Sequence, residues 1–171
     1  RISVFEFMPS EAFLGIKKEP IKTVDKFTHD WWENNGYHIV CALNANYFNN
    51  GTDNSVNGGV ISDKGISQNP FSQNKDFTST IYENGKLTTD DYRGENVEAY
   101  LRNKYKDMFL ATQLGPVLLR GSKEFIDSSS FGHYNSKAMR SFIGQRADGT
   151  ILLVCSISGK GFTVPELRKL A

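Results

Sequence analysis

An apolar run that ends in amides and aromatic rings is the first stretch whose residue types could do chemistry. Residues 39–43, Ile-Val-Cys-Ala-Leu, lead into Asn44, Asn46, Tyr47 and Phe48. Side-chain amides, which both donate and accept hydrogen bonds, can line a polar site. Amides at a strand end can equally turn the chain, and paired rings can belong to the core. The stretch by itself leaves both interpretations open.

A polar loop upstream of a strand brings one histidine and one arginine near each other in sequence. His133 lies in the loop Ser-Ser-Ser-Phe-Gly-His-Tyr-Asn-Ser-Lys, and Arg140 follows it. A guanidinium binds phosphate oxygens through a fork of two hydrogen bonds. An imidazole titrates near neutral pH and can act as a general acid or phosphate donor. The simpler alternatives are an arginine paired with a carboxylate and an exposed loop histidine.

Two further places could present backbone N–H groups to an anion. Gly58 and Gly59 lack side chains, so their backbone could approach a ligand closely, or they could form an ordinary turn. Thr163 precedes Val-Pro-Glu, and the Thr-to-Glu166 spacing is that of a capping box at a helix start. The first turn of a helix can bind an anion, but capping is the simpler role for this threonine.

Signatures of metal and cofactor chemistry are absent from the sequence. There is no P-loop, no Gly-x-Gly-x-x-Gly, no Gly-x-Ser-x-Gly, no His-Glu-x-x-His and no EF-hand loop. His29, His38 and His133 are too scattered to define a triad, and no cysteine has zinc-ligand spacing. We therefore expect no metal and no cofactor. Cys41 and Cys155 lie in apolar runs, as buried free thiols do, or they form a disulfide if their strands are neighbours.

The elements that must position these residues are strands and helices in mixed order. Strict strand–helix alternation is missing, which favours an α+β fold with a mixed, mostly antiparallel sheet and a few packed helices. The pattern predicts strands at 2–7, 37–43, 60–61, 108–112 and 116–119, and hairpins at 81–87 and 140–157 with Asn-Gly and Asp-Gly turns. It predicts helices at 23–35, at 97–105 and from 163. The chain at 44–59 and 67–80 is predicted to be irregular.

Composition restricts the class of protein. The chain has 171 residues, of which 39% are hydrophobic and 23% charged, as in one ordinary globular domain spanning 1–171. Twenty Lys and Arg against 19 Asp and Glu leave a formal net charge of +1, which argues against nucleic acid as the partner. No apolar run is long enough to cross a bilayer, so we expect no membrane insertion.

Five short motifs in a fixed order resemble those of the phosphodiester glycosidase family. The resemblance extends from about Ile39 to Leu167, and each motif alone is weak. The motifs are NANYF (44–48), NGGVISDKG (57–65), QLGPVLLRG (113–121), RSFIGQRADGTILLV (140–154) and GFTVPEL (161–167).

The resemblance implies a hydrolase that cleaves the glycosyl C1–O bond of a sugar-1-phosphodiester in a glycan or glycoconjugate. Arg140 would neutralise the phosphate and Asn44 would orient the substrate, so these two are the expected catalytic residues. The expected substrate-binding residues are Asn46, Tyr47, Gly58, Gly59, His133, Ser141 and Thr163. Two departures from the family pattern are Ser141 in place of the commoner threonine and Ala45-Asn46 in place of a glycine-like pair.

The family pattern continues past its last helix into an Asn-Leu-Asp-Gly-Gly-Gly-Ser stretch, which supplies an aspartate. The sequence ends at Ala171, before such a stretch. We therefore expect that a C-terminal segment of the domain is lacking here, and that such a segment or a second chain completes the site. The alternative is a non-catalytic module that binds a phosphosugar or a cell-surface glycan. Either protein would act outside the cytoplasm, as a secreted, bacterial-envelope, exopolysaccharide-associated or phage-particle protein.

Overall fold

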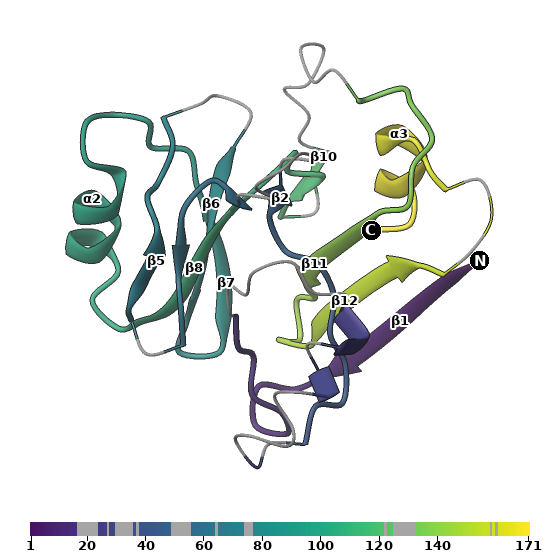
Figure 1. The fold of residues 1–171 in the computed structure, drawn as a ribbon, viewed down its shortest axis with the longest axis horizontal. Helices are drawn as coiled ribbons and strands as arrows, with labels where there is room; N and C mark the ends of the chain where they lie inside the picture. The colour runs from purple at the N-terminus through teal and green to yellow at the C-terminus, as the bar shows by residue number, and fades with distance from the viewer. Residues whose placement is uncertain are drawn as a thin grey trace.

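The described part of the chain forms two main β-sheets with helices packed on them (Figure 1). The structure is a computed structural model. It describes residues 1–16, 24–26, 28–29, 36, 38–48, 56–63, 65–73, 77–121, 123–124, 133–157, 159 and 161–171. The expected α+β fold with mostly antiparallel sheets is confirmed, because every strand pair in it is antiparallel.

The larger sheet has five strands in the order β5-β4-β8-β6-β7. The side chains of Ile61, Ile81, Val97, Leu101 and Ala111 form one core cluster between this sheet and α2. Figure 1 shows α2 along the outer side of the sheet. The elements are β4 (Val60–Ile61), β5 (Ser67–Asn69), β6 (Thr78–Glu83), β7 (Lys86–Asp90), α2 (Val97–Lys104) and β8 (Met108–Leu114).

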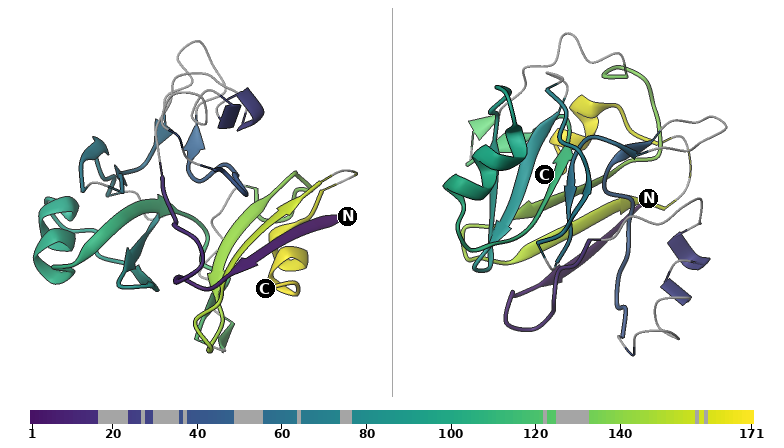
Figure 2. Two further views of the ribbon diagram at one scale, coloured as in Figure 1. Left: turned by 90° about the horizontal axis from the view of Figure 1, so that it is seen from below. Right: turned by 60° about the vertical axis from the view of Figure 1, so that its left-hand side comes forward.

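The smaller sheet has three strands in the order β1-β12-β11, so β11 is an edge strand. Its elements are β1 (Ile2–Phe7), β11 (Ser141–Gln145) and β12 (Ile151–Ser156). Figure 2 shows the short helix α3 (Val164–Arg168) on one side of this sheet and the segment 38–46 on the other. Two short ribbons complete the described strands: β2 (Tyr47–Phe48) with β3 (Val56–Asn57), and β9 (Leu119–Arg120) with β10 (Lys123–Glu124).

A second core cluster joins the two main sheets. It contains the buried side chains of Phe7, Tyr82, Leu110 and Ile151, which come from β1, β6, β8 and β12. Gln145 supports this junction with hydrogen bonds that cross from β11 to the β6–β7 hairpin. The two sheets therefore share buried apolar surface, which favours joint folding.

The structure confirms several predicted elements. The strand at 2–7, the strand at 60–61, the helix at 97–105 and both hairpins are present. Asn84 and Gly85 have φ values of 49° and 78°, as the type I′ turn of a two-residue hairpin requires. Of the helix predicted at 23–35, residues 24–26 and 28–29 are helical, and the rest lies outside the described residues.

Four predictions of local structure are wrong. The stretch 44–59 is not wholly irregular, because it contains β2 and β3. The run at 38–43 is not a buried strand: it pairs with no strand among the described residues, and Val40 is 65% exposed. Residues 116–118 are not a strand. They lie between the end of β8 at Leu114 and the start of β9 at Leu119. The stretch 67–80 is not wholly irregular, because it contains β5 and the start of β6.

The hairpin at β11–β12 has a longer connection than the predicted two-residue turn. The Arg146 N–H donates to the Thr150 carbonyl at 2.9 Å, so three residues separate this pair. Gly149 has a φ of 94°, the left-handed position that a three-residue hairpin loop places before the second strand. Asp148 accepts a hydrogen bond from the Thr150 N–H at 2.9 Å and stabilises the turn.

Candidate functional site

The guanidinium of Arg140 is held by backbone carbonyls, just before the edge strand β11. Its Nε donates to Phe162 at 2.8 Å, and its Nη2 donates to His133 and Ser136 at 2.7 and 2.9 Å. The Arg140 N–H also donates to the Ser156 hydroxyl at 2.7 Å, which fixes the backbone. Within the described residues no carboxylate pairs with Arg140, and Nη1 has no hydrogen-bond partner. Among the described residues, the positive charge is therefore positioned but has no counter-charge.

This arrangement changes how Arg140 could bind a phosphate. The Nε–Nη2 side of the guanidinium, which usually forms the fork on a phosphate, is occupied by carbonyl oxygens. The two N–H groups of Nη1 remain for a ligand. On the described contacts, an anion would therefore contact Arg140 through Nη1 alone.

Thr163 and His133 belong to the two chain segments whose carbonyls accept hydrogen bonds from Arg140, so both lie near it. Thr163 follows Phe162 and caps α3: its hydroxyl accepts from the Glu166 N–H at 3.2 Å, and its own N–H donates to Glu166 Oε2 at 2.9 Å. The predicted capping box is thus present. The hydrogen bond from the Thr163 backbone holds the pKa of Glu166 below its usual value, and Lys137 at 3.3 Å lowers it further. His133 is exposed and contributes its carbonyl to Arg140.

Asn44 and Ser141 meet on the opposite face of the same sheet. The Ser141 hydroxyl donates to the Asn44 carbonyl at 3.1 Å. Successive side chains of a strand point to opposite faces, so Ser141 is directed away from the face on which Arg140 meets Phe162. The side-chain amide of Asn44, an exposed residue, has no hydrogen-bond partner among the described residues. It is therefore available to a ligand.

Asn46 is used by the larger sheet. Its Nδ2 donates to the carbonyls of Gln113 and Gly59 at 3.1 and 3.4 Å, and its Oδ1 accepts from the Thr112 hydroxyl. Both ends of the amide are thus occupied by β8 and by the residue before β4. The segment 44–46 connects the two sheets, because Asn44 contacts Ser141 while Asn46 contacts β8.

Gly58 and Gly59 are buried beside the side chain of Gln113, which is 2% exposed. The Gln113 Oε1 accepts from the N–H groups of Gly59 and Ser72, each at 2.7 Å, and its Nε2 donates to the Ser72 carbonyl at 2.7 Å. The N–H of Gly59 is therefore committed within the protein. A Cβ on Gly59 would lie 2.2 Å from the ring of Phe71, so this position requires glycine for close packing.

The predicted residues thus fall into three groups. Arg140, His133 and Thr163 lie together at the α3 side of the small sheet; Asn44 and Ser141 lie on its other face; and Asn46, Gly58 and Gly59 lie at the larger sheet. Tyr47 is in β2 opposite Asn57, and its side chain is outside the described part of the structure, as is that of Phe48. The roles of these residues remain predictions.

Sequence reasoning missed Gln113 and Ser156. Gln113 is a polar residue near the end of an otherwise apolar strand, Phe-Leu-Ala-Thr-Gln-Leu, and this interruption was the available signal. A buried polar side chain must satisfy its hydrogen bonds, so a glutamine there indicates a nearby backbone to hold. Ser156 had no such signal, because a serine at a strand end is ordinary.

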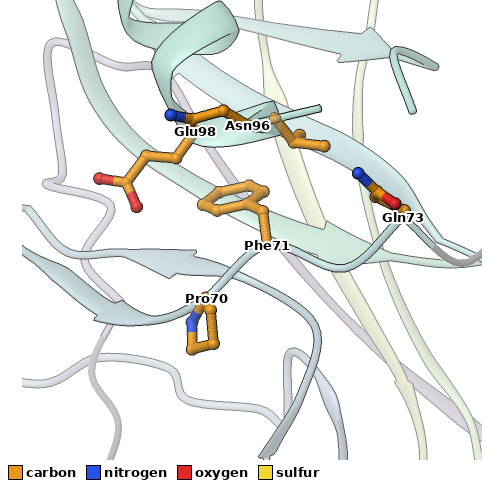
Figure 3. Close-up of a pocket in the computed structure, with 6 residues that line it drawn as sticks. Pro70, Phe71, Gln73, Asn96 and Glu98 are labelled. Carbon is orange, nitrogen blue, oxygen red and sulfur yellow. The ribbon is translucent and has the colours of Figure 1, made fainter. Parts of the chain in front are cut away.

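Two pockets are formed by other described residues, although one of them includes Phe71, whose ring packs against Gly59. One, of about 230 Å³, lies between the start of α2 and the chain after β5 (Figure 3). The other, of about 250 Å³, includes Phe13 and Phe109. Neither is lined by a predicted site residue. The first is lined by Pro70, Phe71, Gln73, Asn96, Val97 and Glu98.

Clusters of metal-ligating side chains and membrane-spanning helices are both absent from the described residues. They hold no group of three or more His, Cys, Asp or Glu side chains that could bind a metal ion. None of their helices has the length and apolar character needed to span a bilayer.

The described residues form an α+β protein in which the guanidinium of Arg140 is held by backbone carbonyls and pairs with no described carboxylate. Residues 37–171 match a family model described as phosphodiester glycosidase. The chain therefore belongs to the phosphodiester glycosidase family, as the five motifs predict. The match includes β2 through α3 and leaves β1 outside. No curated protein and no solved structure matches the chain.

Proposed function

We propose that this protein hydrolyses a sugar-1-phosphodiester at the glycosyl C1–O bond. The observation that carries the proposal is the guanidinium of Arg140, which three backbone carbonyls hold and which no carboxylate neutralises within the described residues. Membership of the phosphodiester glycosidase family supplies the substrate class.

The chemistry explains why one fixed cation is useful. Breaking the C1–O bond leaves positive charge on the sugar ring and moves negative charge onto the departing phosphate. Water adds to C1, so the products are a free sugar and a phosphate monoester. A phosphate oxygen is a weak base, so it can leave without full protonation if a cation stabilises it. Nη1 of Arg140 would supply that stabilisation from a fixed position, with little reorganisation.

The edge position of β11 suggests how Arg140 and Asn44 would share one substrate. The two residues lie on opposite faces of the sheet, but β11 has no neighbouring strand on its outer side among the described residues. A ligand across that edge, at residues 140–141, could present its phosphate to Arg140 and a sugar hydroxyl to the side-chain amide of Asn44. Ser141 would then act by fixing the Asn44 backbone.

The second candidate is a binding module without turnover. It is favoured by the state of Glu166, the carboxylate of the capping box beside Arg140. The Glu166 carboxylate accepts the Thr163 N–H and pairs with Lys137, so both of its oxygens are committed. In either case the proposed ligand is a sugar phosphodiester or polysaccharide, and the proposed place of action is outside the cytoplasm.

The test uses UDP-N-acetylglucosamine and a simple alkyl ester of N-acetylglucosamine 1-phosphate, hydrolysed in ¹⁸O-labelled water. We expect release of free sugar with ¹⁸O on the sugar, because the C1–O bond breaks. Arg140→Ala should lower kcat/KM by at least about 100-fold, the scale of losing one electrostatic stabiliser. The matched control is Arg146→Ala, an exposed arginine of the same strand region that pairs with Glu6 at 2.6 Å.

Each other result has a defined meaning. Binding of the substrates without turnover, abolished by Arg140→Ala and kept by Arg146→Ala, would establish the binding module instead. Turnover and binding that both survive Arg140→Ala would overturn the site assignment. Label on the phosphate rather than the sugar would show cleavage of the P–O bond and contradict the proposed reaction.

A further inference from the structure

A row of small side chains crosses the inner face of the three-stranded sheet. Cys155 on β12 has Ser3 of β1 and Ser141 of β11 as its register partners, so the three side chains share one face. The next row along the same face is larger, with Phe5, Leu153 and Ile143. The small row leaves room for another chain segment to approach the sheet closely.

The segment 38–46 occupies that face. The hydrogen bond from the Ser141 hydroxyl to the Asn44 carbonyl, 3.1 Å long, places Asn44 at the β11 end of the small row. Cys41 lies three residues before Asn44, and both cysteines are half-buried free thiols. Burial raises the pKa of the Cys41 thiol, and the nearby Cys155 raises it further. Cys155 is the register partner of Ser141, and Ser141 holds the Asn44 carbonyl, so segment 38–46 brings Cys41 near the part of the sheet that carries Cys155.

We propose that Cys41 and Cys155 form a disulfide that ties segment 38–46 to β12. Two thiols lose two protons and two electrons, and the S–S bond forms. The oxidant is a second disulfide, which is reduced to two thiols. It can be a small molecule such as oxidised glutathione, or the active-site disulfide of a thiol–disulfide oxidoreductase. One cysteine attacks it as a thiolate, and the second then displaces the mixed-disulfide partner.

This bond would add a covalent link to a segment that pairs with no strand among the described residues. Residues 38–45 form no ladder with any described strand, yet the segment carries Asn44 and leads to Asn46. A covalent link between Cys41 and Cys155 closes a long loop, the case in which a cross-link restricts the unfolded chain most. Disulfides persist in oxidising compartments, which agrees with a place of action outside the cytoplasm. The inference does not depend on the proposed hydrolysis.

The experiment oxidises the reduced, purified protein with oxidised glutathione at low protein concentration and pH 8.5, where more of the Cys41 thiol is ionised. We expect a monomer lighter by about 2 Da with no alkylatable thiol, and a proteolytic fragment that links the Cys41 and Cys155 peptides. The Tm should rise by about 5–10 °C on oxidation. Cys41→Ser and Cys155→Ser should each give only a glutathione adduct.

Three results would overturn the proposal. They are retention of two alkylatable thiols after oxidation, glutathione adducts on both cysteines of the wild-type monomer, and disulfide-linked dimers as the main product. All three are measured on the wild-type chain, so they do not depend on whether the serine variants fold.

Discussion

Asp90 is the clearest case of a buried charge with a defined set of partners. Its side chain is 6% exposed, and its Oδ2 accepts from Lys104 Nζ at 2.8 Å and from the Tyr105 hydroxyl at 2.9 Å. Its Oδ1 accepts from the Tyr92 N–H at 2.9 Å. Burial alone would raise the pKa of Asp90, but these hydrogen bonds and the charge of Lys104 outweigh it, so the pKa is lowered. The folded state therefore favours the ionised carboxylate.

Replacing Asp90 by Asn should reduce stability by an amount that depends on pH. At neutral pH we expect a loss of about 1–3 kcal/mol, since charged hydrogen bonds to a buried group are removed. Because the folded pKa lies below the unfolded value of about 3.9, this stabilisation is complete above that value and is lost as pH falls through the folded pKa. Urea unfolding of wild type and variant at pH 7 and at pH 3 measures the difference.

Asp107→Asn is the matched control for Asp90. Asp107 is exposed and accepts one hydrogen bond from Asn84 at 3.2 Å, so its replacement should change stability by less than about 0.5 kcal/mol. A gap between wild type and Asp90→Asn that widened toward pH 3 would contradict the stated direction of the pKa shift.

At the scale of elements, substitution of Thr163 at the start of α3 tests whether this residue caps the helix or contacts substrate. Thr163→Ala removes the hydroxyl that accepts from the Glu166 N–H, while the backbone half of the capping box remains. We expect a stability loss of about 1 kcal/mol, with kcat/KM on the sugar phosphodiester changed less than about threefold. Thr163→Ser keeps the hydroxyl and should match wild type in unfolding assays. A drop in kcat/KM beyond about tenfold for Thr163→Ala, with stability kept, would instead indicate substrate contact.

The elements also show which structure is encoded locally. The β6–β7 hairpin and the cap of α3 were predictable, because Asn84-Gly85 and the Thr163–Glu166 pair determine their geometry within a few residues. The run at 38–43 was mistaken for a strand because apolar composition is shared by strands and by extended segments that pack on a sheet face. The absence of a strand partner among the described residues and the exposure of Val40 distinguish the two.

The sequence proposes residues for the candidate site, but it does not give their arrangement in space. Arg140 and Thr163 were found from motif order, and the structure places them near each other through Phe162. The hydrogen bonds of Asn46 and Gly59 with Gln113 could not be predicted from the sequence, because Gln113 is more than fifty residues away along the chain. Such long-range backbone contacts leave no periodic signal in a single sequence.

At the scale of the whole molecule, the junction between the two sheets decides whether residues 1–171 behave as the one domain predicted from length. The shared apolar cluster of Phe7, Tyr82, Leu110 and Ile151 draws on both sheets. Gln145 adds polar contacts: its Nε2 donates to the Gly85 carbonyl at 2.8 Å, and its Oε1 accepts from the Leu87 N–H at 3.0 Å. Both kinds of contact favour a single cooperative unit.

Gln145→Ala should therefore destabilise the whole molecule rather than one sheet. It removes three hydrogen bonds, including one to the Gly149 carbonyl at 2.9 Å, and leaves the Leu87 N–H unsatisfied. At about 1 kcal/mol per bond, we expect a loss of roughly 2–3 kcal/mol, in one transition that coincides by near-UV and far-UV circular dichroism. Gln73→Ala, which removes a single exposed bond to Gly94, is the control. Two separate transitions, with Gln145→Ala shifting only one, would mean that the sheets unfold independently.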